Sequence, residues 1–225
     1  MYLKRGSPPT CGSGILFLKI IMKYAILIDA GFAKTKLGNK DNPASASDIV
    51  SFVEKIKNHP FLQEKYLYRV YYYDAPPFSK SKNKPLKGGK HNFGQDPLTV
   101  HNTRLINELK SKDYFALRMG EVRFRGWELI RDAIPEDVDH CQITSENLRP
   151  SLQQKGVDMR IGLDIASLTL KKQVSIIVLV TGDSDFVPPM KFARKEGMQL
   201  AVVTLNHSVH NDLQEHSDLS LHIDL

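Results

Sequence analysis

The feature that most constrains the fold is the pattern of a buried strand that ends in two closely spaced acids. The apolar run Ile176 to Leu179 has no charged residue, as expected for a strand covered on both faces. Val180-Thr181-Gly182-Asp183-Ser184-Asp185-Phe186 follows it, and two prolines after Val187 suit the first turn of a helix. Ligands of open α/β sheets bind at the carboxyl ends of the strands. Two carboxylates in one turn repel each other unless a cation neutralises them, although capping of the helix by one Asp is the simpler alternative.

A second strand ends in the same way near the start of the chain. The short apolar run Tyr24 to Ile28 ends at Asp29 and is followed by a small Ala-Gly pair. Further strands are expected at residues 66–73, 114–119 and 199–204, and helical patterns separate them. Strands and helices that alternate in this way predict an α/β fold with three layers, α/β/α, around a central mainly parallel sheet. Right-handed crossovers would then place all the strand carboxyl ends at one edge.

A third position for an acid is the start of the helix that precedes this motif. The helix is expected to begin at Lys155-Gly156-Val157-Asp158, and Asp158 lies on one stripe with Ile161, Ile165 and Leu168. A first-turn acid is also favoured by the helix dipole, so capping is the ordinary alternative for Asp158. Asp164 lies about 9 Å further along the axis and off the stripe. It is therefore a weaker candidate and a possible ion-pair partner.

Together these acids predict a metal site at the edge of the sheet. Asp29, Asp183 and Asp185 would converge there, and Asp158 can reach the same side. Carboxylates without a matching set of His or Cys select hard cations, here Mg²⁺ or Mn²⁺. Such an ion can activate a water molecule and stabilise the leaving oxygen of a phosphodiester. We assign secondary roles at this site to Thr181, Ser184 and Asp164. His207 and His210 have no further His, Cys or acid at a spacing typical of metal ligands, so we interpret them as residues at the start of a surface helix.

The charge balance favours an anionic partner. Lys and Arg number 31 against 25 Asp and Glu, and the sequence pI is about 9.2, which is compatible with binding to RNA. Residues 78–95 are polar and rich in lysine, so a solvated loop is the default interpretation and guidance of a phosphate backbone is the functional one. The candidate RNA-binding residues are Lys34, Lys80, Lys82, Lys84, Lys87, Arg123, Arg125, Lys155 and Arg160.

The length of 225 residues suits one α/β domain with insertions. We expect this domain at residues 22–225, with the basic loop near 78–95 and an irregular insertion near 127–153. Residues 1–21 are expected to be a loose extension, with Met22 as a possible functional start. Cys11 and Cys141 have no metal-ligand spacing and suit a reducing cytoplasm, and no apolar stretch is long enough to span a membrane. A homo-oligomer is compatible with the sequence.

Three segments in this order resemble the NYN domain family, in particular the LabA-like branch of PIN-type nucleases. They are residues 26–31, residues 155–164 and residues 180–186, and the resemblance extends over roughly residues 22–224. It implies a PIN-like α/β/α fold and metal-dependent ribonuclease activity, with Asp29, Asp158 and Asp183 as metal-binding acids and Asp185 in support. Many members of the family resemble Asp-Gly-x-Asn at the first strand end, whereas Phe32 stands at the position of that Asn here.

Two functions from different classes follow. The favoured one is a Mg²⁺- or Mn²⁺-dependent RNA endonuclease in which water attacks phosphorus. The alternative is a non-catalytic RNA-binding or regulatory module on the same fold, which Phe32 favours and the complete set of acids disfavours. A nucleotide-dependent oxidoreductase is disfavoured because no Gly-rich phosphate loop follows the first strand.

Overall fold

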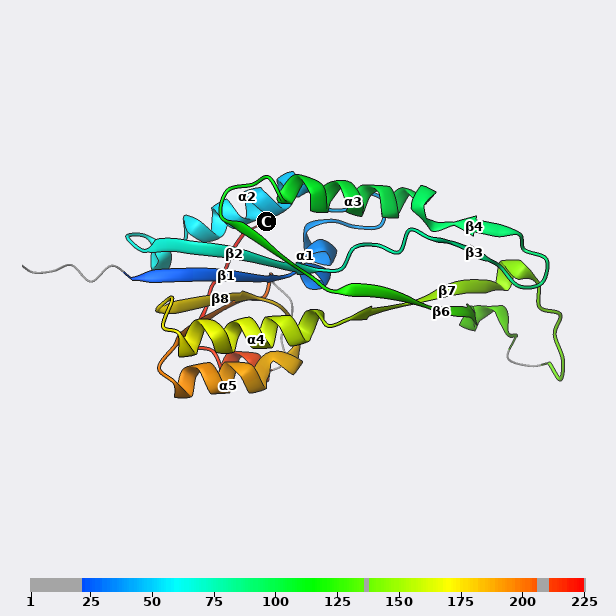
Figure 1. The fold of residues 1–225 in the computed structure, drawn as a ribbon. Helices are drawn as coiled ribbons and strands as arrows, with labels where there is room; N and C mark the ends of the chain where they lie inside the picture. The colour runs from blue at the N-terminus through cyan, green and yellow to red at the C-terminus, as the bar shows by residue number, and fades with distance from the viewer. Residues whose placement is uncertain (1–21, 136–137, 206–210, 225) are drawn as a thin grey trace, which may run out of the picture.

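The central feature of the computed structural model is a parallel sheet of six strands (Figure 1). The structure describes residues 22–135, 138–205 and 211–224. The strand order is β10-β9-β8-β1-β2-β5, and every neighbouring pair is parallel. The strands are β1 (Lys23–Asp29), β2 (Tyr66–Asp74), β5 (Phe115–Met119), β8 (Ile176–Val180), β9 (Gln199–Val203) and β10 (Leu219–Ser220). The expectation of a mainly parallel central sheet is confirmed.

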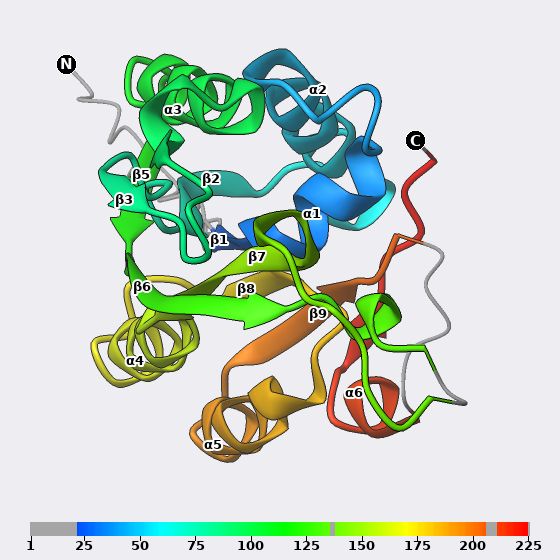
Figure 2. The ribbon, with the colours of Figure 1, turned by 90° about the vertical axis from the view of Figure 1, so that its right-hand side faces the viewer.

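Helices cover both faces of this sheet, which confirms the expected three layers (Figures 1 and 2). One face is covered by α1 (Ala30–Leu37), α2 (Ala46–Lys57) and α3 (Pro97–Leu109). The other face is covered by α4 (Val157–Leu170), α5 (Val187–Lys195) and α6 (Asn211–Glu215). Short 3-10 helices are η1 (Pro60–Leu62), η2 (Phe93–Gln95), η3 (Arg131–Ala133), η4 (Ser145–Asn147) and η5 (Ser184–Phe186).

Two hydrophobic cores, one on each face, hold the layers together. Successive residues of a strand point to opposite faces, so Ile26 and Ile28 of β1 enter the core under α2 and α3. Ala25 and Leu27 enter the core under α4 and α5. Because each strand contributes to both cores, β1 and β8 read as continuous apolar runs. Full burial of a side chain such as Ile28 stabilises the fold by about 1.5–3 kcal/mol.

Two sequence expectations about insertions were wrong in part. The segment 78–95, expected to be a loop, contains the antiparallel hairpin of β3 (Ser81–Asn83) and β4 (Lys90–Asn92). The segment 127–153, expected to be irregular, contains the end of β6 (Glu121–Leu129) and most of β7 (Leu148–Lys155), which pair antiparallel. Both were missed because strands this polar or Pro-containing carry no apolar alternation, and their order comes from backbone pairing and a few aromatic contacts.

The two hairpins form a projection that we call the arm, composed of residues 78–95, 121–135 and 138–155. It extends beyond the edge where the parallel strands end (Figure 1), so that β6 and β7 lie in front of the sheet when it is viewed from that edge (Figure 2). Phe78, Phe93, Phe124 and Trp127 join the hairpins, with ring centroids 5.7 Å apart for Phe78 and Phe124 and 5.9 Å apart for Phe93 and Trp127. Trp127 Nε1 also donates to the carbonyl of Asn83 at 2.8 Å. The arm therefore has a small aromatic core of its own.

Smaller differences concern the ends and faces of helices. The buried face of α3 is formed by Leu105, Ile106 and Leu109, whereas Val100 is 54% exposed. Helix α4 begins at Val157 and not at Lys155, because Lys155 ends β7 and Gly156 turns the chain with φ +75°. No helix in the described ranges is long and apolar enough to cross a membrane. Residues 1–21 and the pair His207 and His210 lie outside the described residues.

Candidate active site

The site lies where β1 and β8 end side by side. Ile28 of β1 pairs with Val180 of β8, so the next residues, Asp29 and Thr181, emerge together at the carboxyl edge. The chain proceeds from β1 to β2 on one side, while β8 flanks β1 on the other side. Such a reversal of strand order opens a crevice in parallel sheets and is their usual ligand site.

Asp29 is held by the first turn of α1. Its Oδ1 accepts hydrogen bonds from the backbone N–H of Gly31 at 2.9 Å and of Phe32 at 3.4 Å, which makes Asp29 the N-cap of α1. The Thr181 hydroxyl lies 3.5 Å from Oδ2, at the long limit of a hydrogen bond. Burial raises the pKa of Asp29, the two N–H donors lower it, and the charges of Asp158 and Asp183 raise it further.

Asp183 caps the 3-10 helix η5. Its Oδ1 accepts from the backbone N–H of Asp185 at 2.9 Å, and its own N–H donates to Thr181 Oγ1 at 3.1 Å. Thr181 is fully buried and thus connects the carboxyl group of Asp29 with the backbone of Asp183. Of this pair of acids, Asp183 therefore caps a helix, as the simpler interpretation of the sequence expected. The carboxyl group of Asp185 caps no helix within the described ranges.

Asp158 approaches the same edge from the start of α4. It stands two residues after Gly156, in the exposed first turn of the helix. Partial burial and then the charges of Asp183 and Asp185 raise the pKa of Asp158. The charges of Asp158 and Asp183 act on Asp29, and those of Asp183 and Asp185 act on Asp158, so we call these four carboxylates the acidic group.

The four carboxylates are suitable ligands for a hard cation, but their side chains do not form a closed metal site in this structure. Asp29 and Asp183 each use one oxygen for capping, and within the described ranges the carboxylates of Asp158 and Asp185 accept no hydrogen bond. Oxygen atoms are therefore left for a ligand. However, among the described residues no three acidic, His or Cys side chains lie close enough together to hold a metal ion as they stand.

One acid at this edge was missed by sequence reasoning. Asp74 ends β2, is only 3% exposed, and accepts from the backbone N–H of Ala75 at 2.8 Å. Lys34 Nζ forms an ion pair with its Oδ2 at 2.8 Å. The signal was present in the sequence, because Asp74 ends its strand as Asp29 does, but the two following prolines suggested only a strand terminator.

The hydroxyl of Tyr72 lies in the same region. It is fully buried and makes no good hydrogen bond within the described part of the chain. Burial raises the pKa of Tyr72, and the nearby carboxylates of Asp74 and Asp29 add to that effect. The Tyr72 hydroxyl is therefore protonated.

Asp164 stands apart from the acidic group. Its Oδ2 accepts from Arg118 Nε at 2.9 Å and from the Tyr73 hydroxyl at 3.0 Å, so the expectation of an ion-pair partner is confirmed. Ser184 is the first residue of η5 and makes no side-chain hydrogen bond within the described ranges.

Most of the candidate RNA-binding residues lie on the arm. Lys80 and Lys87 are exposed, and Lys82 and Lys84 lie over the rings of Phe124 and Trp127 at 5.4 and 5.6 Å from the centroids. Four other candidates contact protein groups. Arg123 and Lys34 form ion pairs with Glu121 and Asp74. Arg125 and Arg160 donate hydrogen bonds to the Gln153 side chain and to the Gly156 carbonyl. Lys155 ends β7 and is partly buried.

Comparison with known proteins supports this architecture. The sequence profile of the NYN domain matches residues 98–224, more than half of the chain, and the matched part contains Asp158, Asp183 and Asp185. The chain belongs to the NYN domain family. This NYN protein thus has a PIN-like, nuclease-type fold, and the family relationship suggests a nuclease-like function related to RNA.

Structural comparison agrees on the fold. A crystal structure of a protein of unknown function from Vibrio parahaemolyticus is similar with a TM-score of 0.50 and 15% sequence identity. The similarity covers 91% of this chain and 94% of that chain, so it extends beyond the part matched by the NYN profile. No curated protein matches the sequence.

Proposed function

We propose that this NYN protein is a Mg²⁺- or Mn²⁺-dependent ribonuclease that cleaves RNA phosphodiester bonds internally by attack of water. The observation that carries the proposal is the mutual influence of the carboxylates of Asp29, Asp158 and Asp183 at the carboxyl edge of the sheet. Like charges gathered at a ligand-binding edge cost free energy, and a divalent cation would recover that cost.

The acids divide the work of holding a cation. Asp29 and Asp183 are fixed by capping bonds, so their free oxygens are pre-positioned, whereas the exposed Asp158 can swing inward from α4. Asp185 adds negative charge near Asp158 and is free to orient a water molecule. A bound Mg²⁺ or Mn²⁺ would lower the pKa of water and stabilise charge on the leaving oxygen. Thr181 keeps Asp29 and Asp183 in register.

The arm would supply the attraction for RNA that an acidic site lacks. Its lysines Lys80, Lys82, Lys84 and Lys87 belong to the 78–95 segment of the arm, which extends from the edge where the acids lie (Figure 1). They would pair with phosphates on either side of the cleaved bond. Contacts on both sides of the bond favour internal cleavage over removal of terminal nucleotides.

A second candidate is a regulatory RNA-binding module without catalysis. It is favoured by Phe32 of α1, because Phe32 packs against the hydrophobic core and stands at the position where many members of the family have Asn. In such a protein the arm would bind RNA and the acids would not turn over substrate.

Cleavage of end-labelled RNA distinguishes the two functions. Single-stranded and structured RNA are incubated with protein in Mn²⁺, Mg²⁺ or chelator. The ribonuclease proposal predicts cleavage only with metal, and a loss of about 100-fold or more in Asp29→Asn and Asp183→Asn, because several kcal/mol of transition-state stabilisation disappear. Asp113→Asn, an exposed acid between α3 and β5, is the matched control and should cleave normally.

Two results would count against the proposal. Cleavage that persists in chelator or in both site variants would exclude the metal mechanism. RNA binding by the wild type without cleavage in either metal would favour the regulatory module.

A further inference from the structure

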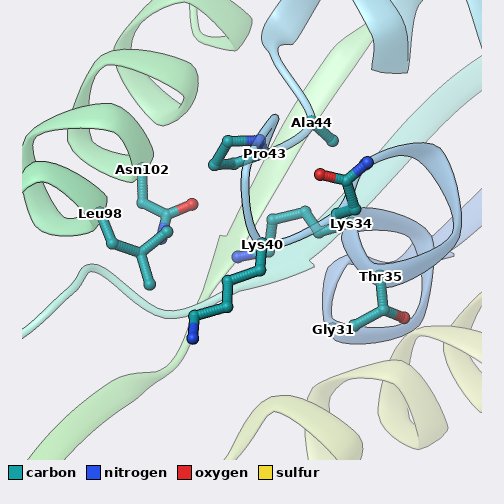
Figure 3. Close-up of a pocket in the computed structure, with 10 residues that line it drawn as sticks. Gly31, Lys34, Thr35, Lys40, Pro43, Ala44, Leu98 and Asn102 are labelled. Atoms are coloured by element: carbon teal, nitrogen blue, oxygen red, sulfur yellow. The ribbon is translucent and has the colours of Figure 1, made fainter.

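A cavity of about 430 Å³ adjoins the acidic group on the α1 side of the sheet (Figure 3). It lies between α1, the loop 38–44 and α3, and Figure 3 shows Leu98 and Asn102 projecting from α3 toward Lys40 and Pro43. Gly31 is part of its wall, and the N–H of Gly31 donates to Asp29. The cavity thus begins beside one of the carboxylates proposed to be catalytic.

Close contacts fix the loop that lines this cavity. Gly38 allows the loop to fold back against the end of α1, since a Cβ there would lie 2.2 Å from the Ala44 nitrogen and 2.9 Å from the Asn42 carbonyl oxygen. The far wall is fixed by His101, whose Nε2 lies 2.8 Å from the carbonyl oxygen of Ala44. The cavity is therefore defined by close backbone contacts as well as by side chains.

The lining combines one free cation, an apolar surface and a free amide. Lys34 is neutralised by Asp74, whereas the exposed Lys40 makes no ion pair within the described ranges. Leu98 is 59% exposed and forms an apolar wall with Pro43. The side-chain amide of Asn102 makes no hydrogen bond with any described residue. A cation can bind a phosphate, an apolar wall can pack against the face of a base, and an amide can hydrogen-bond the polar edge of a base.

A second cavity of about 340 Å³ continues from the first and shares Lys34, Leu98 and Asn102 with it. It reaches the arm, where Phe78 and Phe93 of the aromatic cluster line it. The acids, the two cavities and the arm are thus consecutive, which suits a continuous strand better than a free nucleotide.

We propose that the first cavity binds one nucleotide of a single-stranded RNA, next to the phosphodiester bond held at the acids. The base would lie against Leu98 and Pro43, the Asn102 amide would pair with its edge, and Lys40 would bind the adjoining phosphate. The volume is within the roughly 300–1,000 Å³ of small-molecule sites. This inference rests on the proposed function, because it names where the RNA substrate lies.

Binding of an end-labelled single-stranded RNA, followed by fluorescence anisotropy in chelator, tests the assignment without cleavage. We expect Lys40→Ala and Asn102→Ala each to weaken binding about three- to tenfold, since each removes one contact of about 1 kcal/mol. Lys171→Ala, an exposed lysine at the other end of α4, is the matched control and should bind as the wild type does.

The salt dependence separates the two contacts. Lys40→Ala should reduce the slope of log affinity against log salt by about 0.7, the value for one phosphate of a single strand, while Asn102→Ala should leave the slope unchanged. An RNA with abasic residues should bind the wild type more weakly and be insensitive to Asn102→Ala. A general folding defect would not produce this pattern.

The assignment is overturned if both cavity variants bind RNA as Lys171→Ala does, or if the wild type binds no RNA. Failure of the ribonuclease proposal is a separate result. It would appear as absence of cleavage in Mn²⁺ by a wild-type protein whose RNA affinity still falls in Lys40→Ala and Asn102→Ala.

Discussion

At the scale of single residues, the acids at the carboxyl edge serve both the fold and the proposed chemistry. Asp29 and Asp183 cap helices through one oxygen each, so the fold itself fixes their positions. The pKa of Asp29 and the pKa of Asp158 are both raised by burial and by neighbouring acids. Such groups favour the folded state when protonated, and that stabilisation is lost as the pH rises through the raised pKa.

The first prediction concerns the pH dependence of stability in chelator. Below the ordinary Asp pKa of 3.8, Asp158 is protonated in the folded and unfolded states. As the pH rises toward neutrality it ionises among like charges, so the wild type should lose more stability than Asp158→Asn. We expect the difference in Tm to grow by about 1–3 °C, from about 0.2–1 kcal/mol for exposed charge pairs. A difference in Tm between the two proteins that stays constant across this pH range would contradict the electrostatic coupling of Asp158 with its neighbouring acids.

The second prediction concerns the ion pair of Lys34 and Asp74. Lys34→Met leaves a buried carboxylate without its partner and should cost about 3 kcal/mol, the lower end for a broken buried pair, because Lys34 is partly exposed. Adding Asp74→Asn in the same chain should recover most of this loss. Chemical denaturation measures both variants, and a loss below about 1 kcal/mol for Lys34→Met would contradict a buried charge at Asp74.

At the scale of elements, sequence reasoning succeeded for strands with two buried faces and failed for the arm. The runs at 24–28 and 176–179 are apolar throughout because both sheet faces are covered, so their pattern identifies them. Strands β3 and β4 are three residues each and mostly exposed, so nothing in Ser81–Asn83 or Lys90–Asn92 distinguishes them from a loop. They are ordered by contacts with each other and with β6, which is distant in sequence.

The third prediction compares two glycines of opposite role. Gly38→Ala would bring a Cβ within 2.2 Å of backbone and should destabilise the protein by about 1–3 kcal/mol, as overpacking does. Gly162, inside α4, has only a contact at 4.0 Å with Pro189, so Gly162→Ala should stabilise the protein by about 0.5–1 kcal/mol. Denaturant titrations should give opposite signs. Equal effects from the two changes would contradict the close approach at Gly38.

At the scale of the whole molecule, convergence of the acids could be predicted because parallel topology sends every strand end to one edge. Asp29 and Asp183, 154 positions apart, meet there for that reason. The cavity beside them could not be predicted, because it depends on how closely the loop 38–44 approaches α3. The pairing of Asp74 with Lys34 was also hidden, since a lysine on α1 does not indicate which strand end it reaches.

The central claim is that the acids at this edge together bind a divalent cation, and direct titration of Mn²⁺ tests it. Electron paramagnetic resonance follows the loss of the free-ion signal as protein is added at neutral pH. We predict that the wild type and the Asp113→Asn control bind Mn²⁺, and that Asp158→Asn and Asp183→Asn bind it at least about tenfold more weakly. A free-ion signal that the wild type leaves unchanged, or equal binding by all four proteins, would contradict the claim.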